Sequence, residues 1–234
     1  MWRITRYLDK GVIVEDKGSV TQSAIVLKPG VGSSYGHGWR QMWKFFVELL
    51  LVGIISIIIG IPNGMGAWVG DQVIVNILGI FGFIYSILIV GPVDYGVSFV
   101  HLKAARGDKI EVQDMFEAFR NYLNAVLANI LVGAIVVIGL ILLIIPGIIF
   151  ACKLVFTPYL VVDRKMEVVE AVKESWRMTN GHAWKVFFIG LIAIPICIIG
   201  LILFGVGIIL SIMWIRLTMA SLYHSVSTSG EVIT

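Results

Sequence analysis

Long apolar segments dominate this chain and decide what it can fold into. Runs of about 20 apolar residues match the length that an α-helix needs to cross a hydrocarbon core of about 30 Å. Hydrophobic residues make up 58% of the 234 residues and charged residues 14%, against about 45–50% and about 25% in soluble domains. These values exclude an ordinary soluble globule, and we expect an all-α, polytopic membrane helical bundle.

Proline and glycine divide the apolar sequence into six predicted spans. An unbroken helix over 123–162 would be about 60 Å long, twice the hydrocarbon thickness, so we expect it to break at Pro146-Gly147. Six transmembrane helices joined by short links predict three helical hairpins. The predicted spans are about 44–62, 73–100, 123–145, 147–162, 184–203 and 207–226.

The basic residues favour one orientation. Apart from Lys153 and Arg216, all lysines and arginines precede or open the first span, or lie between spans two and three or four and five. The positive-inside rule then predicts a multi-pass protein of the cell (plasma) membrane with both termini in the cytoplasm. The first 35 residues lack the continuous apolar core of a cleavable signal, so we expect the first span to remain as an anchor.

Three parts are predicted along the chain: an N-terminal cytoplasmic segment, 1–35; a six-helix transmembrane domain, 36–226; and a C-terminal tail, 227–234. Within the first part, residues 12–14 and 24–27 flank the turn-forming stretch 16–19, which leaves a small hairpin and a flexible tail as alternatives.

Two segments between the spans have the periodicity of amphipathic cytoplasmic helices. One carries Val112, Met115, Phe116, Phe119 and Leu123 on a single side. The other carries Val168, Val169, Val172 and Trp176, with Asn180-Gly181 as a predicted stop. Each helix either packs against the base of the bundle or docks to the membrane or a partner.

The hairpins resemble one another in sequence. The stretch GHGWRQMWKFF lies at the entry to the first hairpin and GHAWKVFF at the entry to the third. The second span of each hairpin also contains a similar three-residue sequence that begins with glycine, at 82–84, 147–149 and 207–209. A threefold repeat and a coincidence among abundant Gly and Ile residues both remain open.

Four ionisable residues lie within or near the edges of the spans: Glu48, Asp94, Lys153 and Arg216. A charge facing lipid at the centre of a span costs about 2.5–3.5 kcal/mol on insertion scales, which favours the bundle interior or a wet cavity. Asp94 is the expected partner of Lys153 or Arg216, and Glu48 the local partner of Lys44. The charges, with breaks at Gly91-Pro92, Pro158 and Pro195, predict either a binding pocket open to the cytoplasm or purely structural pairs.

We predict no enzymatic activity and assign no catalytic residue, metal site or cofactor. The G-x-S-x-G string at 32–36 lacks the strand-to-helix setting of a hydrolase nucleophile. The four histidines have no i, i+4 pair, and the two cysteines lie far apart within apolar runs. Since the basic residues follow the membrane topology, nucleic acid is not an expected partner.

The stretch over 142–188 resembles a broad set of poorly characterised prokaryotic six-helix integral membrane proteins, related to the membrane domain of some glycerophosphodiester phosphodiesterases. The shared features are Ile145-Pro146-Gly147, Pro158 with the following Val-Val-Asp163, Glu170-Ala171 through Ser175-Trp176, and Gly181-His182 before Trp184. The resemblance covers about 95–226. It implies the six-helix fold but no activity, because the phosphodiesterase chemistry belongs to a separate soluble domain.

Two hypotheses for function follow. The first is a non-enzymatic membrane scaffold or accessory subunit, whose partners are the lipid bilayer and a membrane protein or a second copy of the chain. The second is a small transporter or lipid-handling protein that uses a polar pocket in the bundle.

Overall fold

A computed structural model of the protein describes residues 30–64, 72–202 and 206–231. All regular elements in these three ranges are helical, which confirms the predicted all-α class. Within these ranges, five helices are long and apolar enough to cross a membrane, or six when the bent pair Val31–Lys44 and Phe46–Pro62 is counted as one span.

The long helices form three hairpins. The first comprises α2 (Phe46–Gly64), α3 (Gln72–Tyr85), the π-helical turn η2 (Ser86–Val90) and α4 (Gly91–Arg106). The second comprises α5 (Tyr122–Leu142), α6 (Ile144–Leu154) and α7 (Thr157–Asp163). The third comprises α9 (Ala183–Ile202) and α10 (Val206–Glu231).

A short helix precedes each hairpin, and we call these three the collar helices. They are α1 (Val31–Lys44), the 3-10 helix η3 (Val112–Asn121) and α8 (Val168–Thr179). The sequence analysis predicted η3 and α8 but not α1, which bends by 92° into α2. A helix thus recurs before each hairpin, while the threefold repeat in sequence stays a prediction.

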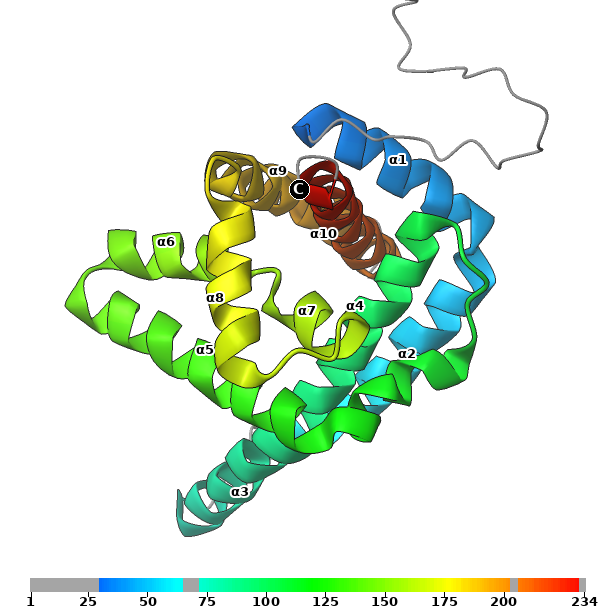
Figure 1. The fold of residues 1–234 in the computed structure, drawn as a ribbon. Helices are drawn as coiled ribbons and strands as arrows, with labels where there is room; N and C mark the ends of the chain where they lie inside the picture. The colour runs from blue at the N-terminus through cyan, green and yellow to red at the C-terminus, as the bar shows by residue number, and fades with distance from the viewer. Residues whose placement is uncertain (1–29, 65–71, 203–205, 232–234) are drawn as a thin grey trace, which may run out of the picture.

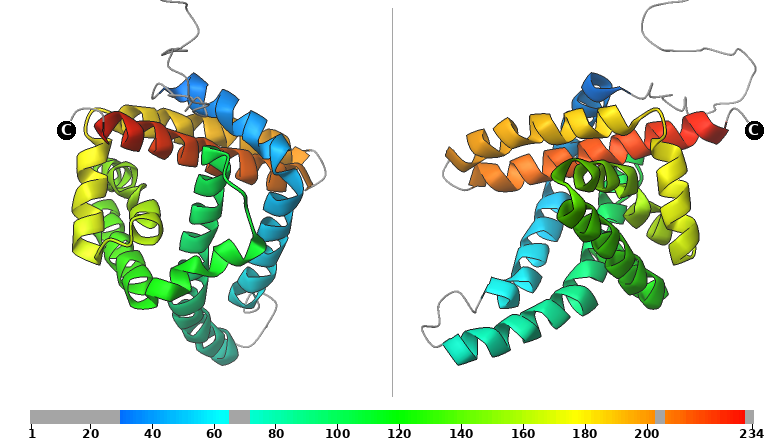
Figure 2. Two further views of the ribbon diagram at one scale, coloured as in Figure 1. Left: turned by 45° about the vertical axis from the view of Figure 1, so that its right-hand side comes forward. Right: turned by 90° about the vertical axis from the view of Figure 1, so that its left-hand side faces the viewer.

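The hairpins cross one another. Figure 2 shows the α9–α10 hairpin lying across the ends of α2 and α4, while α3 points away from it. In Figure 1 the collar helices lie around a central group made of α4, α7 and α10. The core therefore sits beside the collar, where all three hairpins meet.

Burial is concentrated in this region, which we call the packed half: the collar helices with α4, α7 and the C-terminal part of α10. Its largest fully buried side chains include Leu102, Met115, Phe156, Leu160 and Tyr223. At the opposite ends of the hairpins, which we call the hairpin tips, the apolar side chains are exposed. Ile141 is 79% exposed and Ile202 is 75% exposed, as expected for surface that faces lipid.

Close glycine contacts hold two of the tips together. A Cβ atom added to Gly139 of α5 would lie 2.9 Å from the Gly147 Cα of α6. A Cβ atom added to Gly200 of α9 would lie 2.6 Å from the Gly207 carbonyl oxygen of α10. Small residues allow the backbones to approach in this way, as is common between membrane helices.

Some predicted details differ from the structure. The segment from Val112 is a 3-10 helix, not an α-helix, and two residues of its predicted apolar side, Phe116 and Leu123, are largely exposed. Helix α1 begins before the predicted domain start at residue 36, and α10 extends to Glu231, into the predicted tail. The predicted hairpin or tail over 1–29 lies outside the described residues.

Candidate functional site

Two of the predicted intramembrane charges form an ion pair. Arg216 of α10 donates a hydrogen bond from Nη2 to Oδ1 of Asp94 in α4, over 2.6 Å. This contact confirms the expectation that Asp94 pairs with one of the two bases. Both side chains remain partly uncovered by protein, 50% for Asp94 and 36% for Arg216.

Further polar groups gather near this pair. The charges of Asp94 and Arg216 both act on His101 of α4 and Tyr159 of α7. His101 is buried, and its Nδ1–H donates to the Val97 carbonyl oxygen over 2.7 Å. Its Nε2 then lacks a hydrogen-bond partner among the described residues.

Asn129 brings α5 to the same region. A Cβ atom added to Gly91, one turn before Asp94, would lie 3.0 Å from the Asn129 side-chain Cγ, so a larger residue there would displace the Asn129 amide. The half-buried Asn129 amide has no hydrogen bond within the described part of the chain. Sequence reasoning missed Asn129 and Tyr159, although a polar residue inside an apolar span is the signal that would have found them.

The break at Gly91-Pro92 is sealed by a side chain from the second hairpin. Proline lacks an N–H and its ring displaces the carbonyl four residues earlier, here that of Leu88. The Tyr122 hydroxyl of α5 donates to this carbonyl oxygen over 3.0 Å. The preceding turn widens to a π-helix, in which the Gly91 N–H bonds to the Ser86 carbonyl.

The break at Pro158 is sealed by the collar helix α8. The Ser175 and Thr179 hydroxyls donate to the Lys153 carbonyl oxygen over 2.9 and 3.1 Å. The Phe156 N–H donates to the Ser175 Oγ over 3.2 Å. The third expected break is wrong, because α9 continues through Pro195 from Ala183 to Ile202.

Lys153 is not part of the Asp94–Arg216 pair. Its ammonium donates a hydrogen bond to the Asn180 side-chain oxygen and lies 5.1 Å from the centre of the Trp176 ring. Both partners come from the end of α8, so the collar helix satisfies this lysine. The charge predicted to lie deep in the bundle is therefore a contact between α6 and the collar.

Glu48 is half-buried near the start of α2, and it does not pair with Lys44 in the described ranges. Lys44 lies instead over the Phe45 ring, 4.8 Å from its centre. The structure thus brings together Asp94 and Arg216, and leaves Glu48 and Lys153 elsewhere.

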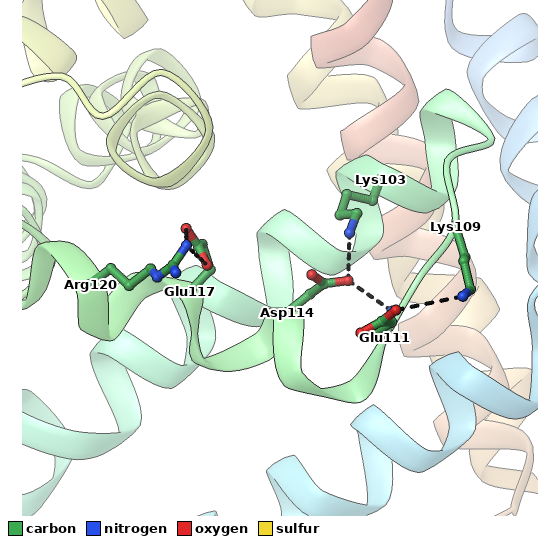
Figure 3. A network of polar contacts seen from close by, with 6 residues as sticks. All are labelled: Lys103, Lys109, Glu111, Asp114, Glu117 and Arg120. Atoms are coloured by element: carbon green, nitrogen blue, oxygen red, sulfur yellow. Dashed lines mark hydrogen bonds and ion pairs between the residues drawn. The ribbon is translucent and has the colours of Figure 1, made fainter.

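A network of charges fixes the collar helix η3 to α4 (Figure 3). Asp114 accepts a hydrogen bond from the Glu111 N–H over 2.8 Å and another from the Lys103 ammonium over 2.7 Å. Asp114 therefore caps η3 and joins it to the preceding span. Lys109–Glu111 and Arg120–Glu117 are more exposed pairs of the same region.

A second bridge joins the first two hairpins. Arg106 at the end of α4 donates two hydrogen bonds to Asp163 at the end of α7, over 2.6 and 2.7 Å. The chain turns beyond both helix ends through a left-handed residue, Gly107 (φ 83°) and Lys165 (φ 52°). The bidentate pair ties these two corners together.

On α8, Arg177 donates two hydrogen bonds of 2.8 Å to Glu174, three residues earlier. These bonds from Arg177 hold the pKa of the Glu174 carboxyl below its ordinary value. The contribution of this pair to stability is present above the ordinary glutamate pKa and is lost as pH falls through the lowered value.

A polar hollow of about 360 Å³ lies between η3, the start of α5, the end of α7 and the segment that leads into α8. Glu117, Arg120, Asn124 and Lys165 contribute to its lining, so acids and bases are mixed there. No group of three His, Cys, Asp or Glu side chains in the described residues is placed to hold a metal ion.

Comparison with known proteins gives one match. A family model described as "Protein of unknown function (DUF975)" matches residues 132–229, from the middle of α5 to near the end of α10. No curated protein and no solved structure matches the chain. The matched region contains Arg216 and the α8 seal, whereas Asp94 and Asn129 precede it.

Proposed function

We propose that the chain is a non-enzymatic scaffold or accessory subunit of the cell membrane. The observation that carries this proposal is the way the two span breaks are sealed. The Leu88 and Lys153 carbonyls, which a transporter would use to line a cavity, are bonded instead to Tyr122, Ser175 and Thr179. These hydrogen bonds favour a rigid helical bundle over one in which the broken helices move to open and close a cavity.

The proposed orientation places the packed half at the cytoplasmic face, with both termini in the cytoplasm. Basic residues on the collar helices and at the end of α4 support this orientation, because the positive-inside bias concentrates Lys and Arg on the cytoplasmic side. Arg40, Lys103, Arg106 and Lys173 all belong to this half. We also retain as a hypothesis the relation to the membrane domain of glycerophosphodiester phosphodiesterases.

The exposed side of α8 is the surface we assign to a partner, either another membrane protein or a second copy of the chain. Val169, Glu170, Lys173 and Arg177 are exposed there, beside a shallow hollow that several of them line. Apolar and charged side chains of both signs occur together, which suits a specific protein contact better than a general lipid surface.

Photocrosslinking in native membranes tests this proposal. A photoreactive amino acid at Lys173, on the exposed side of α8, is expected to give one protein adduct of fixed mass. The same group at Ile198, which is exposed near the α9–α10 tip, is the matched control and is expected to give lipid adducts. Lipid adducts alone at both positions would count against a scaffold.

A small transporter or lipid-handling protein is the second candidate, favoured by one observation. Asp94 and Arg216 keep half and a third of their side-chain surface uncovered by protein, where a purely structural pair would be enclosed. Reconstitution into liposomes tests it: the wild-type chain is expected to move a labelled lipid or solute, and Arg216→Gln to stop the movement. Equal rates for wild type, Arg216→Gln and empty liposomes would remove this candidate.

A further inference from the structure

The uncovered part of the Asp94–Arg216 pair requires a polar neighbour. Both residues belong to helices long and apolar enough to cross a membrane, and Arg216 stands about 14 Å along α10 from Gly207. Hydrocarbon chains cannot replace the hydration that the exposed parts of these charges lose. A polar group from outside the described chain must therefore cover them.

Groups from all three hairpins surround this position. The first hairpin supplies Asp94 and His101, the second Asn129 and Tyr159, and the third Arg216. Two of them have unused hydrogen-bonding capacity: the buried His101 Nε2 and the Asn129 amide, which has no partner among the described residues. In a neutral ring whose Nδ1–H donates to the Val97 carbonyl, Nε2 is an acceptor.

The balance of charge limits what can bind. A lone anion on Arg216 would be repelled by Asp94, and a lone cation on Asp94 would be repelled by Arg216. A group that carries both charges compensates each partner and keeps the site neutral. We propose that Asp94 and Arg216 form a binding site for a zwitterion, with its ammonium on Asp94 and its phosphate or carboxylate on Arg216.

The chemistry of the two ends makes the proposal more specific. A primary ammonium has N–H groups to donate to Asp94 and to the Asn129 amide oxygen. A quaternary ammonium has none, so ethanolamine is favoured over choline. Two sources share this chemistry: the headgroup of an ethanolamine phospholipid and a free amino acid. Binding is independent of the proposed function, since either a scaffold or a lipid-handling protein can hold such a molecule.

Native mass spectrometry of the full chain, released from discs of defined lipid, is the test. Discs contain equal amounts of phosphatidylethanolamine, phosphatidylcholine and phosphatidylglycerol. We expect one phosphatidylethanolamine to be retained per chain, roughly tenfold over each of the other two lipids. In Asp94→Asn we expect this preference to fall at least fivefold and phosphatidylglycerol to gain. Glu111→Gln, in an exposed pair with Lys109, is the matched control and should keep the wild-type preference.

Three outcomes overturn or redirect the proposal. Equal retention of the three lipids, or a preference unchanged in both Asp94→Asn and Arg216→Gln, overturns a site at this pair. A dimer that carries no bound lipid and crosslinks through position 94 overturns it too, because a second copy then covers the charges. Displacement of the bound lipid by millimolar glycine supports the zwitterion and identifies the free solute as its source.

Folding of the variants is controlled separately. Asp94→Asn keeps the size of the side chain, and Arg216→Gln shortens it but leaves a polar amide in its place. Their thermal unfolding in detergent should stay cooperative. If either fails this check, Arg216→Lys replaces it: the charge is kept while the two-pronged contact with a phosphate is lost, and the preference is expected to fall severalfold.

Discussion

The packed half and the hairpin tips contain similar apolar residues but use them differently. In the packed half, Leu102, Met115 and Phe156 are completely buried, and ion pairs connect one element to the next. At the tips, Ile141 and Ile202 are mostly exposed, and the paired helices touch through close backbone contacts at glycines. Hydrophobicity alone therefore identifies the spans without distinguishing a core from a lipid-facing surface.

This difference shows where the fold is specified. Burial against protein requires matched shapes, and burial against lipid requires only apolar character. The ion pairs between elements occur where the three hairpins and the three collar helices converge. The following substitutions compare the two regions directly.

The largest effect is expected from Gly96→Ala in the packed half. A Cβ atom there would lie 2.6 Å from the carbonyl carbon of Met115 in η3, so two backbones must separate. We expect a loss of about 3 kcal/mol in the free energy of unfolding, measured by thermal unfolding in detergent. Gly133→Ala in α5, with nothing within 4 Å, is the control and should be neutral or slightly stabilising. Similar effects for both variants would contradict the close crossing of α4 and η3.

Charge reversal at the intramembrane pair comes next. Asp94→Lys places two bases together in an apolar setting, with an expected loss of about 2.5 kcal/mol. Adding Arg216→Asp restores opposite charges and should recover most of that loss, read as the yield of folded protein in the membrane. Failure of the double variant to exceed Asp94→Lys would show that the pair contributes no specific interaction.

The bridge between the corners is expected to have an intermediate effect. Asp163 is only 12% exposed and receives both hydrogen bonds of Arg106, so Arg106→Ala leaves a mostly buried carboxylate without its partner. We expect a loss of about 2 kcal/mol, measured by thermal unfolding. Arg120→Ala breaks an exposed pair and should cost less than about 0.5 kcal/mol. Equal losses would indicate that the two corners are not coupled through this bridge.

The smallest effect is expected at a tip. In Gly147→Ala the new Cβ atom would lie 2.7 Å from the Leu140 backbone nitrogen, a milder clash than that at Gly96, where the Met115 carbonyl oxygen lies closer still. Because α5 and α6 can separate into lipid there, we expect a loss of only about 1 kcal/mol. Gly190→Ala, in open space, is the control. If Gly147→Ala were as damaging as Gly96→Ala, the tips would be as tightly constrained as the packed half.

The sequence predicted the features that depend on composition and on the positions of proline and glycine. The link at Leu143 lies close to Pro146-Gly147, and α8 ends beside Asn180-Gly181, because proline and glycine act on the local backbone. The pairing of Asp94 with a base also followed from charge alone, since a lone carboxylate is costly in an apolar span.

Features that depend on distant partners were less predictable. The sequence around Lys153 does not indicate that Asn180 is its partner. The sequence around Pro158 likewise does not indicate that Ser175 bonds the backbone at this break. Helix α1 was missed because its buried residues include His37 and Ser34, which do not form an apolar pattern. His37 is buried because it donates a hydrogen bond to the Ala105 carbonyl over 2.8 Å, a contact with no local sequence signal.

The seals at the two breaks also bear on how the protein is made. Tyr122 follows Leu88 along the chain, and Ser175 and Thr179 follow Lys153, so each seal is synthesised after the break that it closes. A nascent span therefore enters the bilayer with a backbone carbonyl that still lacks its hydrogen-bond donor, and such a group is costly in hydrocarbon. We expect the ribosome to extend the chain by some tens of residues before either span can settle, so that maturation of each hairpin waits for the segment that comes next.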